Sequence, residues 1–329
     1  MTRLGFGDAQ LGGLHRTLDE QEAEQTLEAV YNAGILYYDT SPFYGHGRSE
    51  HRVGHYLRQQ PRDSFVVSMK VGRLYKSAHL PPGHFKQRSQ IWTDGLPFVF
   101  EFDYTYDGVM RSHEDSLQRL GVDRVEVLLI HDLDVDLYDG EDGIAGAMDQ
   151  LDSGGGLKAL MQLRDSGAIK VIGAGINHEE MIKQFLDRFD HDVFLLAMPY
   201  SLIEQNALDE ILPMCAERKV CIIKGAPYAS GVLATGAVSH AHYNYAPATP
   251  EVLEKVRRIE QVCHRHEAQL RSVALQYTFG HECIVSTIPG VMSLQEVYDN
   301  VQMMSAEIPQ DLWSELKAEG LLRSDAPTP

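Results

Sequence analysis

The chain has 329 residues, of which 43% are hydrophobic, and its formal net charge is −18. This length suffices for one large core, and no Pro-rich or Ser-rich linker divides it, so we expect a single domain over residues 1–329. The negative charge argues against nucleic acid or an acidic membrane as a partner, because phosphates would be repelled.

The N-terminal residues and the cysteines favour a cytoplasmic protein. The first residues contain no long apolar run of the kind that forms a secretion signal, and the longest apolar runs are too short to cross a bilayer. We expect reduced core thiols and no disulfide framework, because no CxxC spacing is present among Cys215, Cys221, Cys263 and Cys283.

Apolar runs that alternate with helical patterns predict eight strands, each followed by helix. The first helix should begin at a capping box formed by Thr17 and Glu20 and run to Asn32. Eight such units in a chain of this size favour a closed (β/α)8 barrel over an open doubly wound sheet. The strands are expected at 3–7, 36–38, 65–71, 125–130, 169–174, 193–198, 220–224 and 284–288. The other helices are expected at 48–59, 107–120, 157–166, 179–188, 206–218, 250–279, 293–304 and 309–319.

Three long segments without a clear pattern, 74–106, 132–156 and 226–249, follow the third, fourth and seventh strands. They fall at the C-terminal face of the barrel, where such folds place their chemistry. Trp92 and Asp132 lie in the first two segments and are candidate substrate-pocket residues. Trp92 begins a run of aromatic residues that either lines a pocket or pins the segment to the barrel; the run continues with Phe98, Phe100, Phe102 and Tyr104.

Four polar residues fall at or just beyond strand ends: Asp39, Tyr44, Lys70 and His131. Each alone has an ordinary explanation as a cap, a loop residue, an extended surface lysine or a core histidine. Together they suit proton transfer coupled to hydride transfer. A phenol ionises only near about pH 10, but an ammonium beside it stabilises the phenolate and a carboxylate can hold that ammonium. A neutral imidazole can then orient a substrate oxygen.

These residues lie in motifs that resemble the aldo-keto reductase family. The motifs occur in the family's order across about 300 residues, and the Asp, Tyr-Gly, Lys and His set within them is specific. The matching pieces are LGFG (4–7), YDTSPFYGHGRSE (38–50), SMKVG (68–72), LLIHDLD (128–134), GAGIN (173–177), YSLIEQ (200–205) and STIPG (286–290).

The resemblance implies a role for each of the four residues. Tyr44 would be the proton donor or acceptor, Lys70 the cation that favours its phenolate, and Asp39 the residue that orients Lys70. His131 would position the substrate. Family members bind a nicotinamide cofactor across the barrel mouth without a Rossmann domain, which fits the absence of a complete GxGxxG motif here.

The resemblance also suggests cofactor-binding residues. Asn177 matches the residue that holds the carboxamide of nicotinamide, and Gly7 ends the first strand at the mouth. The tyrosine that stacks on nicotinamide in other members is replaced here, where alignment leaves Gly225 or Ala226, and Tyr228 is the candidate to compensate.

The last strand departs from the pattern of NADP-preferring members. They place a lysine and an arginine that grip the 2′-phosphate where this chain has Gly290 and Glu296, while Asp299 and Asn300 match the pair that contacts adenine. Charge-assisted bonds to such a phosphate contribute roughly 1.5–3 kcal/mol each. We therefore predict NAD as the cofactor, although Glu296 could also be an ordinary solvated residue in the first turn of a helix.

Within the family, the stretches 4–14, 70–74 and 173–177 resemble the aldose 1-dehydrogenases and the related pyridoxal 4-dehydrogenase. The implied reaction is NAD-dependent oxidation of a cyclic hemiacetal, such as L-fucose, D-arabinose or pyridoxal, to its lactone. Two alternatives stay open: an NADPH-dependent carbonyl reductase and a non-catalytic cofactor-binding subunit. We predict no metal site. His51 and His55 have helical spacing, but Arg52 stands where an HExxH motif needs glutamate.

Overall fold

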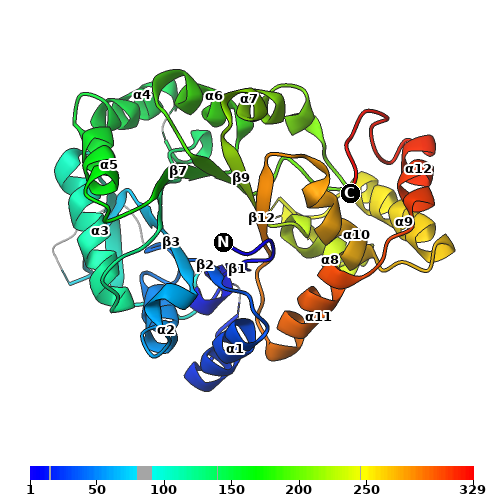
Figure 1. Ribbon diagram of the computed structural model, residues 1–329, viewed down its shortest axis with the longest axis horizontal. Helices are drawn as coiled ribbons and strands as arrows, with labels where there is room; N and C mark the ends of the chain where they lie inside the picture. The colour runs from blue at the N-terminus through cyan, green and yellow to red at the C-terminus, as the bar shows by residue number, and fades with distance from the viewer. Residues whose placement is uncertain (15, 80–90, 139, 245) are drawn as a thin grey trace.

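Eight parallel strands form a barrel in the computed structural model, which describes residues 1–14, 16–79, 91–138, 140–244 and 246–329. Single bridges between Leu4 and Thr287 and between Gly7 and Gly290 join the last strand to the first and close the barrel (Figure 1). The predicted (β/α)8 barrel is confirmed. In order around the barrel the strands are β1 (Phe6–Gly7), β2 (Tyr37–Asp39), β3 (Val66–Val71), β6 (Val127–His131), β7 (Val171–Ile176), β8 (Val193–Leu196), β9 (Cys221–Gly225) and β12 (Ile284–Ile288).

Helices surround the barrel, and two of them, α9 (Pro250–Arg265) and α12 (Gln310–Ala318), extend to one side (Figure 1). The predicted helix over 250–279 is divided into α9 and α10 (Leu270–Tyr277). The other helices are α1 (Glu20–Asn32), α2 (Arg48–Leu57), α3 (Tyr106–Leu120), α4 (Gly140–Leu151), α5 (Gly156–Asp165), α6 (Glu179–Arg188), α7 (Ile211–Arg218), α8 (Val232–Thr235), α10 (Leu270–Tyr277) and α11 (Leu294–Ser305).

The start of α1 differs from the prediction. Asp19 caps the helix: its carboxylate accepts a hydrogen bond from Glu22 N at 2.8 Å, and the Glu22 carboxylate accepts one from Asp19 N at 3.3 Å. Thr17 instead contacts the Thr93 hydroxyl at 3.2 Å. Both Thr17 and Asp19 have a glutamate three residues on, so the capping-box pattern fitted two registers and the wrong one was chosen.

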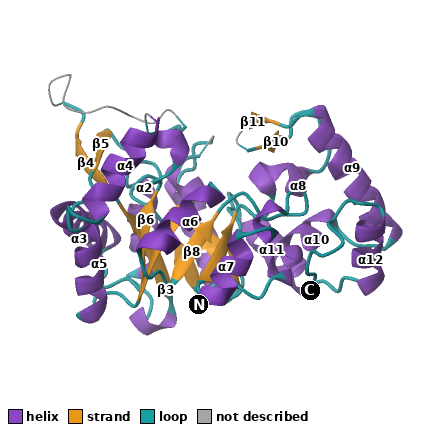
Figure 2. Ribbon diagram, turned by 90° about the horizontal axis from the view of Figure 1, so that it is seen from above, coloured by secondary structure: helices purple, strands orange, loops and turns teal. Residues whose placement is uncertain are grey.

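The three long segments contain regular structure that the sequence did not predict. An antiparallel hairpin of β4 (Arg73–Ser77) and β5 (Phe98–Phe102) occupies the first; residues 80–90 of this segment lie outside the described residues. The second contains α4. The third contains α8 and a short ladder of β10 (His242–Tyr243) and β11 (Ala246–Pro247). Figure 2 shows both hairpins on the same side of the barrel, which is the C-terminal face of the strands.

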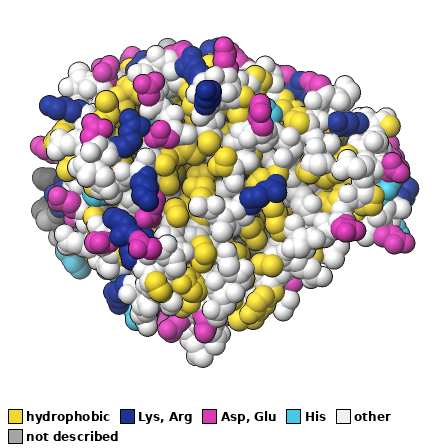
Figure 3. All heavy atoms as spheres, in the orientation of Figure 1, with side chains coloured by type: hydrophobic (Ala, Val, Ile, Leu, Met, Phe, Trp, Pro, Cys, Tyr) yellow, Lys and Arg dark blue, Asp and Glu magenta, His cyan; other side chains and the backbone are white. Residues whose placement is uncertain are grey.

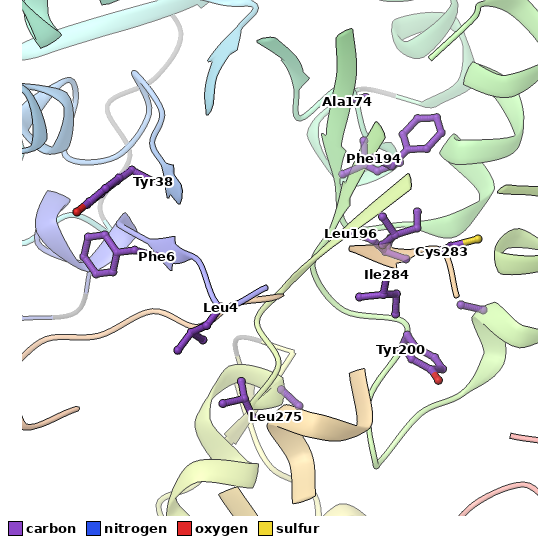
Figure 4. Packing of buried hydrophobic residues seen from close by; sticks show 14 of the residues in the cluster. Leu4, Phe6, Tyr38, Ala174, Phe194, Leu196, Tyr200, Leu275, Cys283 and Ile284 are labelled. Carbon is purple, nitrogen blue, oxygen red and sulfur yellow. The ribbon is translucent and has the colours of Figure 1, made fainter. Parts of the chain in front are cut away.

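Apolar residues pack in two layers, inside the barrel and between the barrel and its helices. Tyr37 belongs to the inner cluster and Tyr38 to the outer one, where it meets Phe6 edge-on at 6.0 Å between ring centroids (Figure 4). Because side chains alternate along a strand, Asp39 shares the inward side of β2 with Tyr37. The alternation therefore places Asp39 at the mouth of the barrel.

The face of the barrel seen in Figure 1 carries both apolar and charged side chains. Figure 3 shows apolar side chains near its centre and charged side chains around them. The four cysteines are free thiols, three of them buried. Among the described helices, none combines the length and the apolar composition that crossing a bilayer would need.

Candidate active site

A buried ion pair joins β2 and β3 at the barrel mouth. Lys70 Nζ donates to Asp39 Oδ2 at 2.6 Å and to the Thr40 carbonyl at 2.9 Å, and Asp39 and Lys70 are each 1% exposed. The Ser68 hydroxyl donates to the other Asp39 oxygen at 2.5 Å. A buried pair of charges is tolerated only when further hydrogen bonds complete it, as here. The Lys70 ammonium is therefore fixed in place with its charge balanced.

Tyr44 lies half-buried beside this ammonium. Lys70 Nζ lies 4.8 Å from the centroid of the Tyr44 ring, and the His131 ring stands nearly perpendicular to it, with 6.1 Å between centroids. The loop that carries Tyr44 is held by close packing of Gly45 on Gly12, where a Cβ on either residue would overlap the backbone of the other. Gly45 also has a φ of 64°, which glycine tolerates best.

His131 ends β6 and is held at both its ring and its backbone. Its Nδ1 lies 3.0 Å from Ser41 Oγ and 3.0 Å from an Arg73 nitrogen, while Tyr104 donates to its carbonyl at 2.7 Å. Burial, with smaller contributions from Arg73 and Lys70, lowers the pKa of His131 well below its ordinary value. His131 is therefore a neutral imidazole at neutral pH, the form that can donate a hydrogen bond to a substrate oxygen without being a strong acid.

Arg73 is a site residue that the sequence interpretation missed. It begins β4, its side chain is 2% exposed, and its guanidinium forms an ion pair with Asp132 at 2.7 Å. The guanidinium lies over the rings of Phe43, at 4.2 Å, and Phe102, at 4.7 Å. A basic residue three positions after Lys70, within the KVGRL stretch, was the available signal. Arg73 falls between the predicted strand 65–71 and the segment 74–106, so neither prediction included it.

The two predicted pocket residues lie at this same mouth. The Trp92 ring packs 5.2 Å from that of Phe43 and 5.8 Å from that of Tyr44, and Trp92 is 7% exposed. Asp132 Oδ1 lies 3.4 Å from His131 Nε2. The structure thus brings Trp92 and Asp132 together with Asp39, Tyr44, Lys70 and His131, so that an aromatic wall and a carboxylate flank the four residues.

Asn177 follows β7 at the mouth and is positioned by a residue that the sequence interpretation also missed. Asp134 is 1% exposed, and its Oδ2 accepts from Asn177 N at 2.6 Å and from His178 N at 3.3 Å. Asp134 Oδ1 also lies 2.7 Å from His178 Nδ1. One carboxylate therefore fixes the turn that carries Asn177.

Gly7 and Gly290 form the seam where the barrel closes. Gly7 N donates to the Pro289 carbonyl at 3.2 Å, and Gly7 pairs with Gly290. A Cβ on Gly290 would overlap the Gln10 side chain. A Cβ on Gly7 would lie 3.1 Å from the Ile288 carbonyl oxygen, so glycine suits the close approach of backbone there.

The first turns of α11 carry the remaining candidates. Ser293 caps the helix, and the Glu296 carboxylate accepts from Met292 N at 2.7 Å, so a negative charge sits at the helix N-terminus. Asn300 is buried, and its side-chain oxygen accepts from the Tyr228 hydroxyl at 2.6 Å. The structure thus brings Tyr228 to α11, where its hydroxyl is already bonded.

Two arginines reach this region, and the sequence interpretation named neither. Arg271 pairs with Asp299 at 3.0 Å. Arg16 donates to the Met292 carbonyl at 3.3 Å and lies 3.5 Å from Glu22. Both cations already have acidic partners, so neither offers an unbalanced charge to an anion at α11.

The histidine pair of His51 and His55 lies on α2. His55 Nδ1 lies 3.0 Å from an Arg58 nitrogen. Across the part of the chain that the structure describes, no group of three or more His, Cys, Asp or Glu side chains is placed to hold a metal ion.

Comparisons with known proteins identify the family of the chain. The model of the Aldo/keto reductase family matches residues 3–319. The chain is 37% identical to pyridoxal 4-dehydrogenase from Microbacterium luteolum, over 98% of this chain and 95% of that protein. It is 34% identical to D-threo-aldose 1-dehydrogenase from a Pseudomonas species, over 99% of this chain and 95% of that protein.

Solved structures resemble the fold. The holo form of the aldo-keto reductase AKR11C1 from Bacillus halodurans superposes with a TM-score of 0.71 at 22% identity, covering 98% of this chain and 93% of that one. The glycerol dehydrogenase AKR11B4 from Gluconobacter oxydans gives a TM-score of 0.69 at 17% identity, over 99% and 93%. At these identities the likeness supports the barrel alone.

Proposed function

This chain belongs to the aldo/keto reductase family of oxidoreductases, whose members bind a nicotinamide cofactor, and from that membership we propose that it oxidises a cyclic hemiacetal to its lactone with NAD. The observation that carries the proposal is the Asp39–Lys70 pair, with Tyr44 and a neutral His131 around it at one mouth.

The residues around α11 fit NAD better than NADP. The stretch 286–305 contains no lysine or arginine, and the Glu296 carboxylate occupies the helix N-terminus where a 2′-phosphate would otherwise be attracted. In this proposal Glu296 accepts from ribose hydroxyls, Asp299 and Asn300 contact adenine, and Asn177 holds the carboxamide. Gly7, Gly290 and Tyr228 line the rest of the proposed NAD site. NAD, when bound, supplies the acceptor for the hydride.

The protein side of the reaction is proton transfer and orientation. Tyr44 takes the proton of the hemiacetal hydroxyl, so that the C–H and O–H bonds break and the carbonyl of the lactone forms. The Lys70 ammonium stabilises the phenolate that accepts this proton, and Asp39 keeps Lys70 in place. His131 donates from Nε2 to the substrate oxygen and orients it.

The substrate class is supported by the relatives and by the aromatic side chains at the mouth. The names of two relatives specify pyridoxal and D-threo-aldoses, and both kinds of molecule are cyclic hemiacetals in water. The Trp92 and Phe43 rings offer a surface that stacks on a pyridine ring or on the apolar face of a sugar.

The test is the absorbance at 340 nm with NAD and, separately, L-fucose, D-arabinose and pyridoxal, repeated with NADP. We expect the absorbance to increase with NAD but not with NADP. The substrate that gives the fastest increase identifies the hemiacetal. Consumption of NADPH with simple aldehydes would contradict the proposal and favour the carbonyl reductase. No change in absorbance with any combination of cofactor and substrate would favour a non-catalytic cofactor-binding subunit.

A further inference from the structure

The guanidinium of Arg73 contacts the catalytic histidine and the residue after it at the same time. One terminal nitrogen lies 3.0 Å from His131 Nδ1, and the other lies 2.7 Å from Asp132 Oδ2. The rings of Phe43 and Phe102 hold the guanidinium, and the Arg73 side chain is 2% exposed. Arg73 is therefore a rigid group, and its geometry with His131 is set by the barrel and the β4–β5 hairpin together.

This contact determines which nitrogen of His131 carries the proton. A guanidinium has only donors, so His131 Nδ1 must accept and must lack a proton. The Ser41 hydroxyl, 3.0 Å from the same nitrogen, already accepts from Phe43 N at 3.0 Å, which leaves its own hydrogen to point at Nδ1. The proton of the neutral imidazole is then on Nε2.

The cations around the His131 ring also favour its neutral form. Arg73 and Lys70 are cations that disfavour a second positive charge on His131. Asp132 is the nearby anion, with Oδ1 at 3.4 Å from Nε2, but its other oxygen is bound by Arg73. Tyr44 faces the ring edge-on. Asp39 is bound to Lys70, so its charge is already balanced.

We propose that Arg73 is a positioning residue that holds His131 as a neutral imidazole with its proton on Nε2, directed at the substrate oxygen. This proposal rests on the proposed function only for its kinetic consequence, because the tautomer is a property of the free protein. Arg73 itself touches neither substrate nor cofactor in this account, and it acts through His131 and Asp132.

The first test needs no substrate and no variant of Arg73. In histidine-labelled protein, the nitrogen-15 NMR signals of His131 are assigned by their loss in His131→Asn. We expect the neutral Nε2–H pattern to persist below the pH at which an ordinary histidine, with a pKa of about 6.5, takes up its second proton, because burial and the neighbouring cations lower the pKa of His131. A proton on Nδ1, or titration near the ordinary value of about 6.5, would overturn the proposal.

The second test removes the guanidinium. In Arg73→Met the cation is lost and Asp132 is released beside Nε2, so we expect His131 to titrate at least about one pH unit higher than in the wild type. The value of kcat/KM should then decrease at low pH, as His131 becomes protonated. Arg73→Lys keeps the positive charge but cannot contact His131 and Asp132 with two separate nitrogens. Compared with Arg73→Met, it should restore the neutral His131 ring while recovering only part of kcat.

Lys76→Met is the matched control, because Lys76 lies on the same strand and pairs with Glu101 on β5, not with His131. It should leave the His131 signals and the pH profile as in the wild type. A shift in Lys76→Met equal to that in Arg73→Met would mean that the hairpin, and not the guanidinium, sets the state of His131. Loss of turnover in every variant with unchanged NMR signals would also contradict the positioning role.

Discussion

Two lysines lie buried at the ends of barrel strands, one on each side of the mouth, and their charges are balanced differently. Lys70 on β3 donates to the Asp39 carboxylate at 2.6 Å. Lys224 on β9 is 0% exposed and donates only to backbone carbonyls, those of Ala197 and Gly225. Burial lowers the pKa of Lys224 to about 7, with Glu204 opposing the shift.

Lys70 has a carboxylate to balance its charge, whereas Lys224 has backbone carbonyls, and burial beside carbonyls lowers the pKa of Lys224. The side with β2, β3 and β6 is built around the Asp39–Lys70 ion pair. On the other side, around β9 and α11, polar groups are bonded to one another, as Tyr228 is to Asn300 and Arg271 is to Asp299. Chemistry is expected on the first side and recognition on the second.

The largest effect should come from removing the phenol beside Lys70. Tyr44→Phe keeps the ring that packs on Trp92 and loses only the hydroxyl, so kcat should fall by about 10²–10⁴-fold while the Kd for NAD stays nearly unchanged. The measurement is turnover with the best hemiacetal together with calorimetric binding of NAD. A kcat above about a tenth of the wild-type value, a barrier change of about 1.4 kcal/mol, would exclude Tyr44 as the acid/base.

Breaking the ion pair tests the charged side directly. Lys70→Met leaves the Asp39 carboxylate buried without its cation, which should lower the free energy of unfolding by about 3–5 kcal/mol and abolish turnover. Denaturant unfolding followed by circular dichroism measures the stability.

The matched control is the double variant Asp39→Asn with Lys70→Met, in which both charges are gone. It should recover most of the lost stability but none of the activity, because nothing then favours the phenolate. Recovery of activity in the double variant would mean that the pair is structural and that the comparison with Lys224 has no bearing on catalysis.

The recognition side is tested by changing its charge. Glu296→Arg replaces the carboxylate at the N-terminus of α11 with a cation that can grip a 2′-phosphate, so the KM for NADP should fall roughly 10- to 100-fold while that for NAD rises. Steady-state kinetics with both cofactors give the ratio. Glu307→Arg makes the same change in net charge just beyond the other end of α11 and should leave the ratio unaltered; an equal response would indicate a general charge effect.

The sequence predicted which residues meet on the Asp39–Lys70 side of the mouth better than those that meet around Lys224 and α11, for physical reasons. Asp39 and His131 end strands with a clear apolar pattern and Lys70 is the next-to-last residue of another, and strand ends of a barrel share one face. The state of Lys224 depends instead on two carbonyls that only the folded backbone brings to it. Arg73 was missed because its strand pairs with a segment about 25 residues away, and period-2 alternation in so short a hairpin was not recognised.

The sharpest test of the comparison concerns Lys224. Its folded pKa lies below the unfolded one, so the unfolded chain binds more protons between about pH 7 and 10.4, and wild-type stability should rise with pH there by up to about 1.4 kcal/mol per unit. Below pH 7 this contribution is flat. Lys224→Met cannot titrate, so its stability advantage over the wild type should be greatest at pH 7 and shrink toward pH 10. Lys183→Met, on the exposed face of α6, serves as the control. Parallel curves for wild type and Lys224→Met would mean that the Ala197 and Gly225 carbonyls hold an ammonium as well as Asp39 does, and both sides of the mouth would then carry a maintained charge.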